Sequence, residues 1–228
     1  NGIKMSKSKG NVVSPDDLVR DYGCDSLRMY ELFVGPPELD AEWDDRGIDG
    51  VNRFLKRVWN LVMDSKDADV KASKEMIKER HRLIYDVTTR LESFSLNTVI
   101  SGFMEYNNKL IELAKKTGGI DRETIETFVK LLAPFAPHLT EEIWEAYGHE
   151  DSVFHAEWPK ADEEAMKDDE IEVPVQINGK TRAVISISAE ASKEEAIAAG
   201  KEAVADKLTG AIVKEIYVPK KIINIVQK

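Results

Sequence analysis

The sequence predicts an α+β fold that is mostly helical, with an antiparallel helix bundle followed by a small ββαββ domain. Apolar residues recur at steps of three and four through the middle of the chain, which is the period of amphipathic helices. After residue 170 the apolar period changes to two, as in half-buried strands. A charged segment separates the two patterns, so we expect the strand-forming tail to fold as an independent domain.

The first part of the chain predicts a loop and two short helices. Residues 1–13 are rich in Lys, Ser, Gly and Asn and have no apolar period. A helix should start at Ser14-Pro15, because a capping hydroxyl, a proline at the first helical position and two following acids suit a helix start. It should end near Gly23 in a left-handed cap. A second helix should cover about 25–34, stopped by Gly35-Pro36-Pro37.

The following segment predicts four or five amphipathic helices with short loops, which is the pattern of an antiparallel bundle. The first of them carries an apolar stripe at Val51, Phe54, Leu55, Val58, Trp59 and Val62. The others are expected at about 74–91, 96–116, 122–133 and 138–147. Start signals stand at Ser95, Asp121 and Pro137, and stop signals at Gly118-Gly119 and Gly148.

An acidic linker should connect the bundle to the tail. The stretch from Lys160 to Glu170 is mostly acidic and has one large apolar residue, which is typical of a solvated linker; residues 149–170 together carry two basic and nine acidic side chains. A catalytic or metal-binding acid cluster is the alternative, and it is the less favoured one.

The tail predicts two hairpin strands, a helix and two more strands. Apolar residues alternate at Ile171, Val173, Val175 and Ile177, and again at Ala183, Ile185 and Ile187. Asn178-Gly179 between them is a two-residue hairpin turn. Ser192 to Glu195 forms a capping box that should open a helix to about Leu208. Further strands are expected at 211–218 and 221–227, with Pro219 between them.

Composition excludes some classes of site. Cys24 is the only cysteine, which rules out an internal disulfide and a multi-cysteine zinc site within this sequence. The four histidines show no metal-ligand spacing, so we expect no metal site among His81, His138, His149 and His155. No apolar run approaches the roughly 18 residues of a membrane span, and no leader pattern is present. We therefore expect no membrane association and a reducing, cytoplasmic setting.

Net charge alone does not decide the partner. The formal charge of −10 argues at first against nucleic acid, since phosphate contacts need Lys and Arg. The acidity lies in the middle of the chain and the linker, however, whereas residues 171–228 carry nine basic and seven acidic side chains. The chain starts abruptly at Asn1-Gly2-Ile3, so we expect it to be part of a longer protein.

The sharpest local feature is the pentapeptide Lys4-Met5-Ser6-Lys7-Ser8, followed by Lys9-Gly10-Asn11. A flexible loop with lysines and hydroxyls at this spacing can close over a triphosphate. The ammonium groups would offset the charge that develops on leaving pyrophosphate, and the hydroxyls and backbone N–H groups would donate to its oxygens. A bare Lys/Ser-rich loop is more often merely solvated, but the helix start that follows directly favours the functional interpretation.

This pentapeptide resembles the second signature motif, KMSKS, of class I aminoacyl-tRNA synthetases. The run from Asp21 to Arg28 and on to Asp40-Ala41-Glu42-Trp43 looks like the segment that links that loop to a helical anticodon-binding domain. The run from Leu131 to Trp144 is similar to one shared by the leucyl, isoleucyl and valyl enzymes. The resemblance covers essentially the whole chain, in the order that the family has.

The tail favours the bacterial leucyl-tRNA synthetases. Isoleucyl enzymes of this type often end in a cysteine zinc cluster, which Cys24 alone cannot make, and valyl enzymes end in a coiled-coil arm, for which the tail has no heptads. The run from Val173 to Arg182 and the closing Ile216-Tyr217-Val218-Pro219 are similar to the leucyl enzyme's C-terminal domain. An isoleucyl- or valyl-type fragment remains the alternative within the family.

The resemblance implies a two-step ligase that uses ATP with Mg²⁺, leucine and tRNA(Leu). Lys7 would stabilise the transition state, with Lys4 assisting, and the ATP contacts would come from Lys4, Met5, Ser6, Lys7 and Ser8. The resemblance assigns residues 1–42 to the end of a catalytic domain, 43–160 to an anticodon-binding-type bundle, 161–170 to the acidic linker and 171–228 to a tRNA-binding domain. The other signature motif, the leucine pocket and an editing domain would lie upstream, so the fragment alone should be inactive. No zinc site is implied, and we expect a monomer.

Two basic surfaces are candidates for tRNA contact. Arg53, Lys56, Arg57 and Asn60 share the helix face opposite the Phe54/Val58 stripe, where they could follow phosphates or merely be solvated. The tail offers Lys180 and Arg182 beside the hairpin, and Lys214, Lys220 and Lys221 on or near the later strands. Trp59, Trp144 and Trp158 could stack on bases, but their apolar neighbours favour packing.

Two interpretations from other classes compete with the enzyme fragment. A stand-alone adaptor that binds tRNA or protein would not need the loop at residues 4–8. A purely structural helical protein would leave both that loop and the hairpin tail unexplained.

Overall fold

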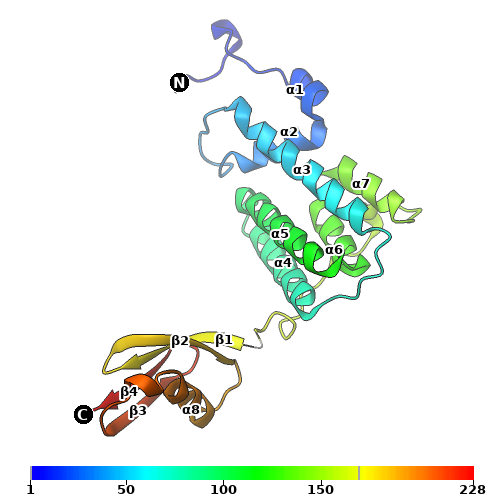
Figure 1. The fold of residues 1–228 in the computed structure, drawn as a ribbon. Helices are drawn as coiled ribbons and strands as arrows, with labels where there is room; N and C mark the ends of the chain where they lie inside the picture. Colours follow the sequence, from blue (N-terminus) through cyan, green and yellow to red (C-terminus); the bar gives the residue numbers. More distant parts are fainter. Residues whose placement is uncertain (1, 169) are drawn as a thin grey trace. The chain divides into compact units, whose positions relative to one another are not determined.

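A computed structural model of the protein describes residues 2–168 and 170–228 (Figure 1). Asn1, the start of the expected catalytic segment, and Asp169, within the expected linker, lie outside the described residues. The chain divides into two compact units, Asn1–Met166 and Lys167–Lys228. We call them the helical unit and the tail, and describe each by itself.

The helical unit confirms the expected helices to within about one residue at nearly every end. After a single 3₁₀ turn, η1 (Lys7–Lys9), come α1 (Pro15–Tyr22), α2 (Cys24–Phe33), α3 (Asp45–Ser65), α4 (Lys74–Glu92), α5 (Leu96–Thr117), α6 (Arg122–Leu132), α7 (Pro137–Ala146) and the turn η2 (Val153–His155). Figure 1 shows α4 and α5 side by side, joined by a short turn. Side-chain oxygens cap three of the helices, since Asp44, Ser73 and Asp121 accept from N–H groups of the first turns of α3, α4 and α6.

The cap expected at Gly23 differs in its geometry. Gly23 has the positive φ of 86° that favours glycine, but its ψ of 157° is extended, outside the left-handed helical region. The reason is that α2 begins at the next residue. Gly23 therefore ends one helix and starts the next, and its carbonyl accepts from Leu27 N–H (3.4 Å).

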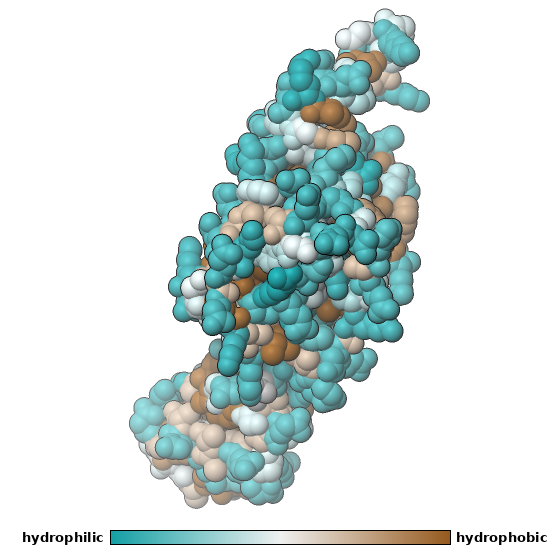
Figure 2. Space-filling view, turned by 90° about the vertical axis from the view of Figure 1, so that its right-hand side faces the viewer, coloured by the Kyte–Doolittle hydropathy of each residue, from teal (hydrophilic) through white to brown (hydrophobic). Residues whose placement is uncertain are grey.

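One apolar core fills the helical unit. The stripe predicted on α3 is buried at Val51, Phe54, Leu55, Val58 and Val62, and Trp59 at its edge is half-buried. Phe103 at the centre lies 5.4 Å from Phe135 in an edge-to-face arrangement, measured between ring centroids. Trp144 is buried as expected and stacks on His149 at 3.7 Å. Hydrophilic residues cover most of the surface of this unit that Figure 2 shows.

The segment after η2 is attached to α4. We call residues 156–166 the strap. Trp158 Nε1 donates to Thr88 Oγ1 (2.9 Å), the Asp162 N–H donates to His81 Nδ1 (3.0 Å), and Arg82 donates to the Met166 carbonyl (3.2 Å). The acidic side chains of the strap are exposed, as the sequence predicts, but its backbone is held against the helix.

The tail is a four-stranded mixed sheet with one helix. It contains β1 (Glu170–Ile177), β2 (Lys180–Ser188), α8 (Lys193–Ala203), the 3₁₀ turn η3 (Ala205–Lys207), β3 (Ile212–Val218) and β4 (Ile222–Gln227), in the spatial order β2-β1-β4-β3. The two hairpins are antiparallel, and β1 pairs with β4 in parallel. Asn178 and Gly179 have φ of 49° and 80°, as a two-residue turn with both central residues left-handed requires.

One face of this sheet is covered by α8. The core of the tail comprises Val173, Val175, Ile177, Ile187, Ala196, Val204, Ile223 and Ile225. Gly200 allows the close approach of α8, because a Cβ there would lie 3.0 Å from a methyl group of Ile223. The predicted capping box is present, with Ser192 and Glu195 bonded in both directions. The helix ends at Ala203 instead of about Leu208, since the chain turns at the buried Val204 and continues as η3.

Candidate functional site

The loop at residues 4–8 presents its lysines to solvent. Lys4 and Lys7 are exposed, and neither ammonium group has an ion-pair partner among the residues that the structure describes. The Ser6 and Ser8 hydroxyls are 3.2 Å apart, and η1 places Lys7 at the start of a tight turn. The five residues thus lie in one exposed turn with two cations and two hydroxyls available to a ligand.

Sequence reasoning missed the residue that closes this turn. Asn11 Oδ1 accepts from the Ser6 N–H (2.9 Å), and Asn11 Nδ2 is 3.5 Å from the Lys4 carbonyl oxygen. Gly10 makes the reversal possible with a left-handed φ of 61°. A polar residue directly after a glycine was the available signal, but its partners depend on how the loop folds back.

The loop fits phosphate oxygens better than a metal ion. Residues 2–13 carry lysines, hydroxyls and amides but no carboxylate, and hard cations such as Mg²⁺ prefer carboxylate oxygens. Within residues 2–168 and 170–228, no group of three or more His, Cys, Asp or Glu side chains is arranged to hold a metal.

Helices α1 and α2 join the loop-bearing segment to the bundle through polar contacts. Asn52 Nδ2, on α3, donates to the Tyr22 carbonyl (2.9 Å), and the Tyr30 hydroxyl donates to the Asp44 carbonyl (2.6 Å). Asp25 accepts from the start of α7. These contacts give the helix that follows the loop a defined place on the bundle.

The predicted basic face of α3 is exposed and lies between two hollows. Arg53, Lys56, Arg57 and Asn60 all face solvent. Lys56 and Asn60 border a hollow of about 480 Å³ that Trp59 and His138 also line. Arg57 and Asn60 border a second hollow of about 450 Å³, which Lys115 also lines. Arg57 also donates to Asn108 (2.7 Å), which fixes its position.

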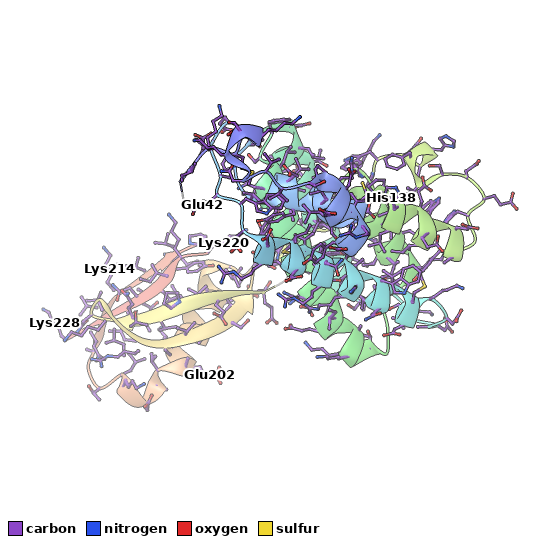
Figure 3. All side chains as sticks on the ribbon, turned by 90° about the horizontal axis from the view of Figure 1, so that it is seen from above. Glu42, His138, Glu202, Lys214, Lys220 and Lys228 are labelled. Carbon is purple, nitrogen blue, oxygen red and sulfur yellow. The ribbon has the colours of Figure 1, made fainter. Side chains whose placement is uncertain are left out.

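The basic residues of the tail do not form one cluster. Lys180, Arg182, Lys214, Lys220 and Lys221 are all exposed. Figure 3 labels Lys214 on β3, Lys220 in the turn between β3 and β4, and Glu202 on α8. Lys180 pairs with Ile177 at one end of the edge strand β2. Lys220 and Lys221 precede β4 at the opposite end of the sheet, because β1 and β4 run in parallel. The predicted basic residues therefore lie at separate places on the sheet.

A third hollow of the helical unit is acidic. A hollow of about 1040 Å³ beside α7 is lined by Glu141, Glu142, Glu145, Glu150 and Asp151, together with His138, His149 and Phe154. Phosphates would be repelled here. His138 also lines the hollow beside Lys56, so the acidic side chains of α7 and the basic side chains of α3 lie on neighbouring surfaces.

The helices of the described residues contain no stretch long and apolar enough to cross a membrane.

Two family models match the chain. One is described as the anticodon-binding domain of tRNA ligase and matches residues 73–197. The other, tRNA synthetases class I (I, L, M and V), matches residues 1–44, which include the exposed turn.

Known proteins are similar over the whole chain. A leucine–tRNA ligase of Fervidobacterium nodosum is 45% identical and one of Petrotoga mobilis is 42% identical, each aligned with 100% of this chain. The chain spans 30% of the length of these relatives. A solved structure from Agrobacterium radiobacter K84, described as a ternary complex of LeuRS, tRNA and LeuAMS, has a TM-score of 0.81 and 29% identity, covering 100% of this chain and 31% of that one.

Proposed function

The chain belongs to the tRNA ligases that carry this anticodon-binding domain, and from that premise we propose that it is the ATP-loop and tRNA-contacting part of a leucine–tRNA ligase. The observation that supports this most is the similarity to leucine–tRNA ligases along the entire chain, with the exposed turn in the segment that matches class I synthetases. An adaptor that only binds RNA is not favoured, because it would not need that turn.

The proposed reaction has two steps. In the first, a leucine carboxylate oxygen attacks the α-phosphorus of ATP, and the bond to the leaving pyrophosphate breaks. In the second, a ribose hydroxyl of the tRNA 3′ end attacks the leucyl carbonyl, and AMP leaves. The parts of the protein that bind leucine and the adenosine would lie outside this chain, which spans 30% of the length of its relatives.

The exposed turn acts in the first step. Negative charge grows on the oxygens of the leaving pyrophosphate, and a positioned ammonium group stabilises it most where water is excluded. Lys7 is the proposed catalytic residue, with Lys4 beside it, and Ser6 and Ser8 contribute hydroxyl donors. Mg²⁺ bound to the phosphates would offset the remaining charge.

The tRNA is held by charge in this proposal. The α3 face with Arg53, Lys56 and Arg57 and the tail with Lys180, Arg182, Lys220 and Lys221 would contact phosphates. Their exposure supports these surfaces. We also propose that the protein acts as a monomer.

The proposal is tested by the amino-acid dependence of the full-length protein. Exchange of pyrophosphate with ATP should require leucine, and isoleucine and valine should support it far less well. Leucine should then be transferred to tRNA(Leu). If isoleucine or valine is preferred, the enzyme type is wrong. If no amino acid supports exchange while tRNA still binds, the adaptor alternative holds instead.

A further inference from the structure

The exposed turn at residues 4–8 is closed by one side chain that lies outside it. Asn11 bridges two backbone groups on either side of Met5, accepting from the Ser6 N–H at 2.9 Å and donating toward the Lys4 carbonyl at 3.5 Å. Asn11 and Ser6 are half-buried, whereas Lys4 and Lys7 are exposed. The amide is therefore the inner part of the turn and the lysines are its outer part.

Backbone hydrogen bonds complete the turn around this amide. The Lys9 N–H donates to the Ser6 carbonyl (3.1 Å), and the Gly10 N–H donates to the Lys7 carbonyl (3.2 Å). The left-handed Gly10 then returns the chain so that Asn11 reaches Ser6. Lys7 is held by these backbone bonds, whereas the contact with Asn11 is the only hydrogen bond of the Lys4 backbone among the described residues.

We propose that Asn11 is a positioning residue that makes the Lys4 and Lys7 ammonium groups act on a triphosphate as one unit. The inference rests on the proposed function of the turn. Without the amide, the Lys4 side of the turn would move independently of the Lys7 side, and the two cations would have to be ordered separately at each reaction. Ordering reacting groups in advance removes that entropic cost, and a misplacement of about 1 Å can lower a rate on the order of 10²-fold.

If Asn11 had a purely structural role, removing its amide would change the thermal unfolding of the chain. The hydrogen-bond partners of its side chain, Lys4 and Ser6, lie within the turn, while the core of the helical unit begins at Met29 and includes no residue of the turn. Removing the amide should therefore leave the thermal unfolding of the chain unchanged. Its effect should be confined to reactions that involve ATP.

The test is pyrophosphate exchange by the full-length enzyme carrying Asn11→Ala. We expect kcat to fall about tenfold or more, with an unchanged KM for leucine and an unchanged Tm. Asn11→Asp keeps the acceptor for Ser6 but loses the donor for Lys4 and adds a negative charge beside the phosphates, so it should be impaired as well. The matched control is Val12→Ala, whose side chain is 51% exposed and makes none of these bonds.

A double-variant cycle separates this inference from the proposed function. If Asn11 acts through the lysines, Asn11→Ala should slow exchange much less in a Lys7→Ala background than in the wild type. Equal effects in both backgrounds, or wild-type exchange in Asn11→Ala, would overturn the inference. A Lys7→Ala enzyme with normal exchange would instead overturn the catalytic role of the turn itself.

Discussion

Asp25, at the start of α2, accepts two hydrogen bonds from His138, a residue 113 positions later in the chain. Its Oδ1 lies 3.2 Å from the His138 backbone nitrogen and 2.9 Å from the ring Nδ1. Its Oδ2 accepts from the Leu139 N–H at 2.7 Å. A carboxylate from one helix thus caps another, where the helix dipole also favours negative charge.

Replacing Asp25 should measurably destabilise the helical unit. Asp25→Ala leaves the N–H groups of α7 without their acceptor, so we expect a loss of about 1–3 kcal/mol in the free energy of unfolding. His138→Ala should cost less, because the backbone bonds remain and its side chain is 71% exposed. Urea denaturation followed by circular dichroism measures both. Asp86→Ala, at an exposed position in the interior of α4, is the control, and an equal loss there would argue against the cap.

Lys7 should be needed for adenylate formation, and Lys9 should not. Lys7→Ala in the full-length enzyme should slow pyrophosphate exchange on the order of 10²-fold, as the loss of one donor to a developing oxyanion does. Leucine binding should change little. Lys9→Ala also removes one positive charge, but from the exposed residue that directly follows the pentapeptide. Similar exchange rates for the two variants would show that only the summed charge of the loop matters.

Limited trypsin digestion should separate the tail first. Cleavage is expected within about 160–170, at Lys160 or Lys167, before any cut in the helices, because exposed polar segments are preferred sites of nicking. The strap adds a finer expectation. Thr88→Ala removes the partner of Trp158 and should speed cleavage after Lys160 more than after Lys167. First cuts inside α3 to α7 would place the boundary elsewhere.

The charges of the tail should set the salt dependence of tRNA binding. Replacing Lys180, Arg182, Lys220 and Lys221 by alanine should weaken binding. It should also flatten the slope of log affinity against log salt by about one counterion for each phosphate that the variant no longer neutralises. A second variant of the full-length enzyme, with Arg53, Lys56 and Arg57 replaced, provides the comparison. If only that second variant changes the slope, the phosphates lie against α3 and not against the tail.

Acid should destabilise the chain through His81. Burial, and then the nearby Arg80, lower the pKa of His81, although Asp162 and Glu123 act in the opposite direction. The folded state therefore binds fewer protons than the unfolded state, whose histidine pKa is about 6.5. The contribution of neutral His81 to the free energy of unfolding is fully present above the unfolded pKa. It is lost as the pH falls through the lower pKa of the folded state. Protonation of Nδ1 would also remove the acceptor of the Asp162 N–H.

The matched measurement uses His81→Asn, whose amide oxygen can accept a hydrogen bond but does not titrate in this range. As the pH falls from 7 to 5, the unfolding free energy of the wild type should decrease more than that of the variant. The ordinary histidine pKa sets this window. Parallel pH profiles for the two proteins would remove His81 as the cause.

Local sequence was enough to define the helices, the strands and the loop. Helix periods, caps at Asp121 and Ser192 and the Asn178-Gly179 turn each depend on residues only a few positions apart. The pentapeptide of residues 4–8 could be found for the same reason, because its residue types and spacing lie in one short segment. The exposed side of α3 likewise followed from its apolar stripe alone.

How distant segments meet depends on the tertiary structure. The parallel pairing of β1 with β4 puts Lys220 and Lys221 at the end of the sheet opposite Lys180, and no local pattern encodes that pairing. The strap's hydrogen bonds with Thr88 and His81 join residues about 70 to 80 positions apart. The hydrogen bonds between Asp25 and His138 span a longer separation still. A hydrogen bond is specific in distance and angle but not in sequence separation, so a buried polar group requires a partner while the fold selects which partner it receives.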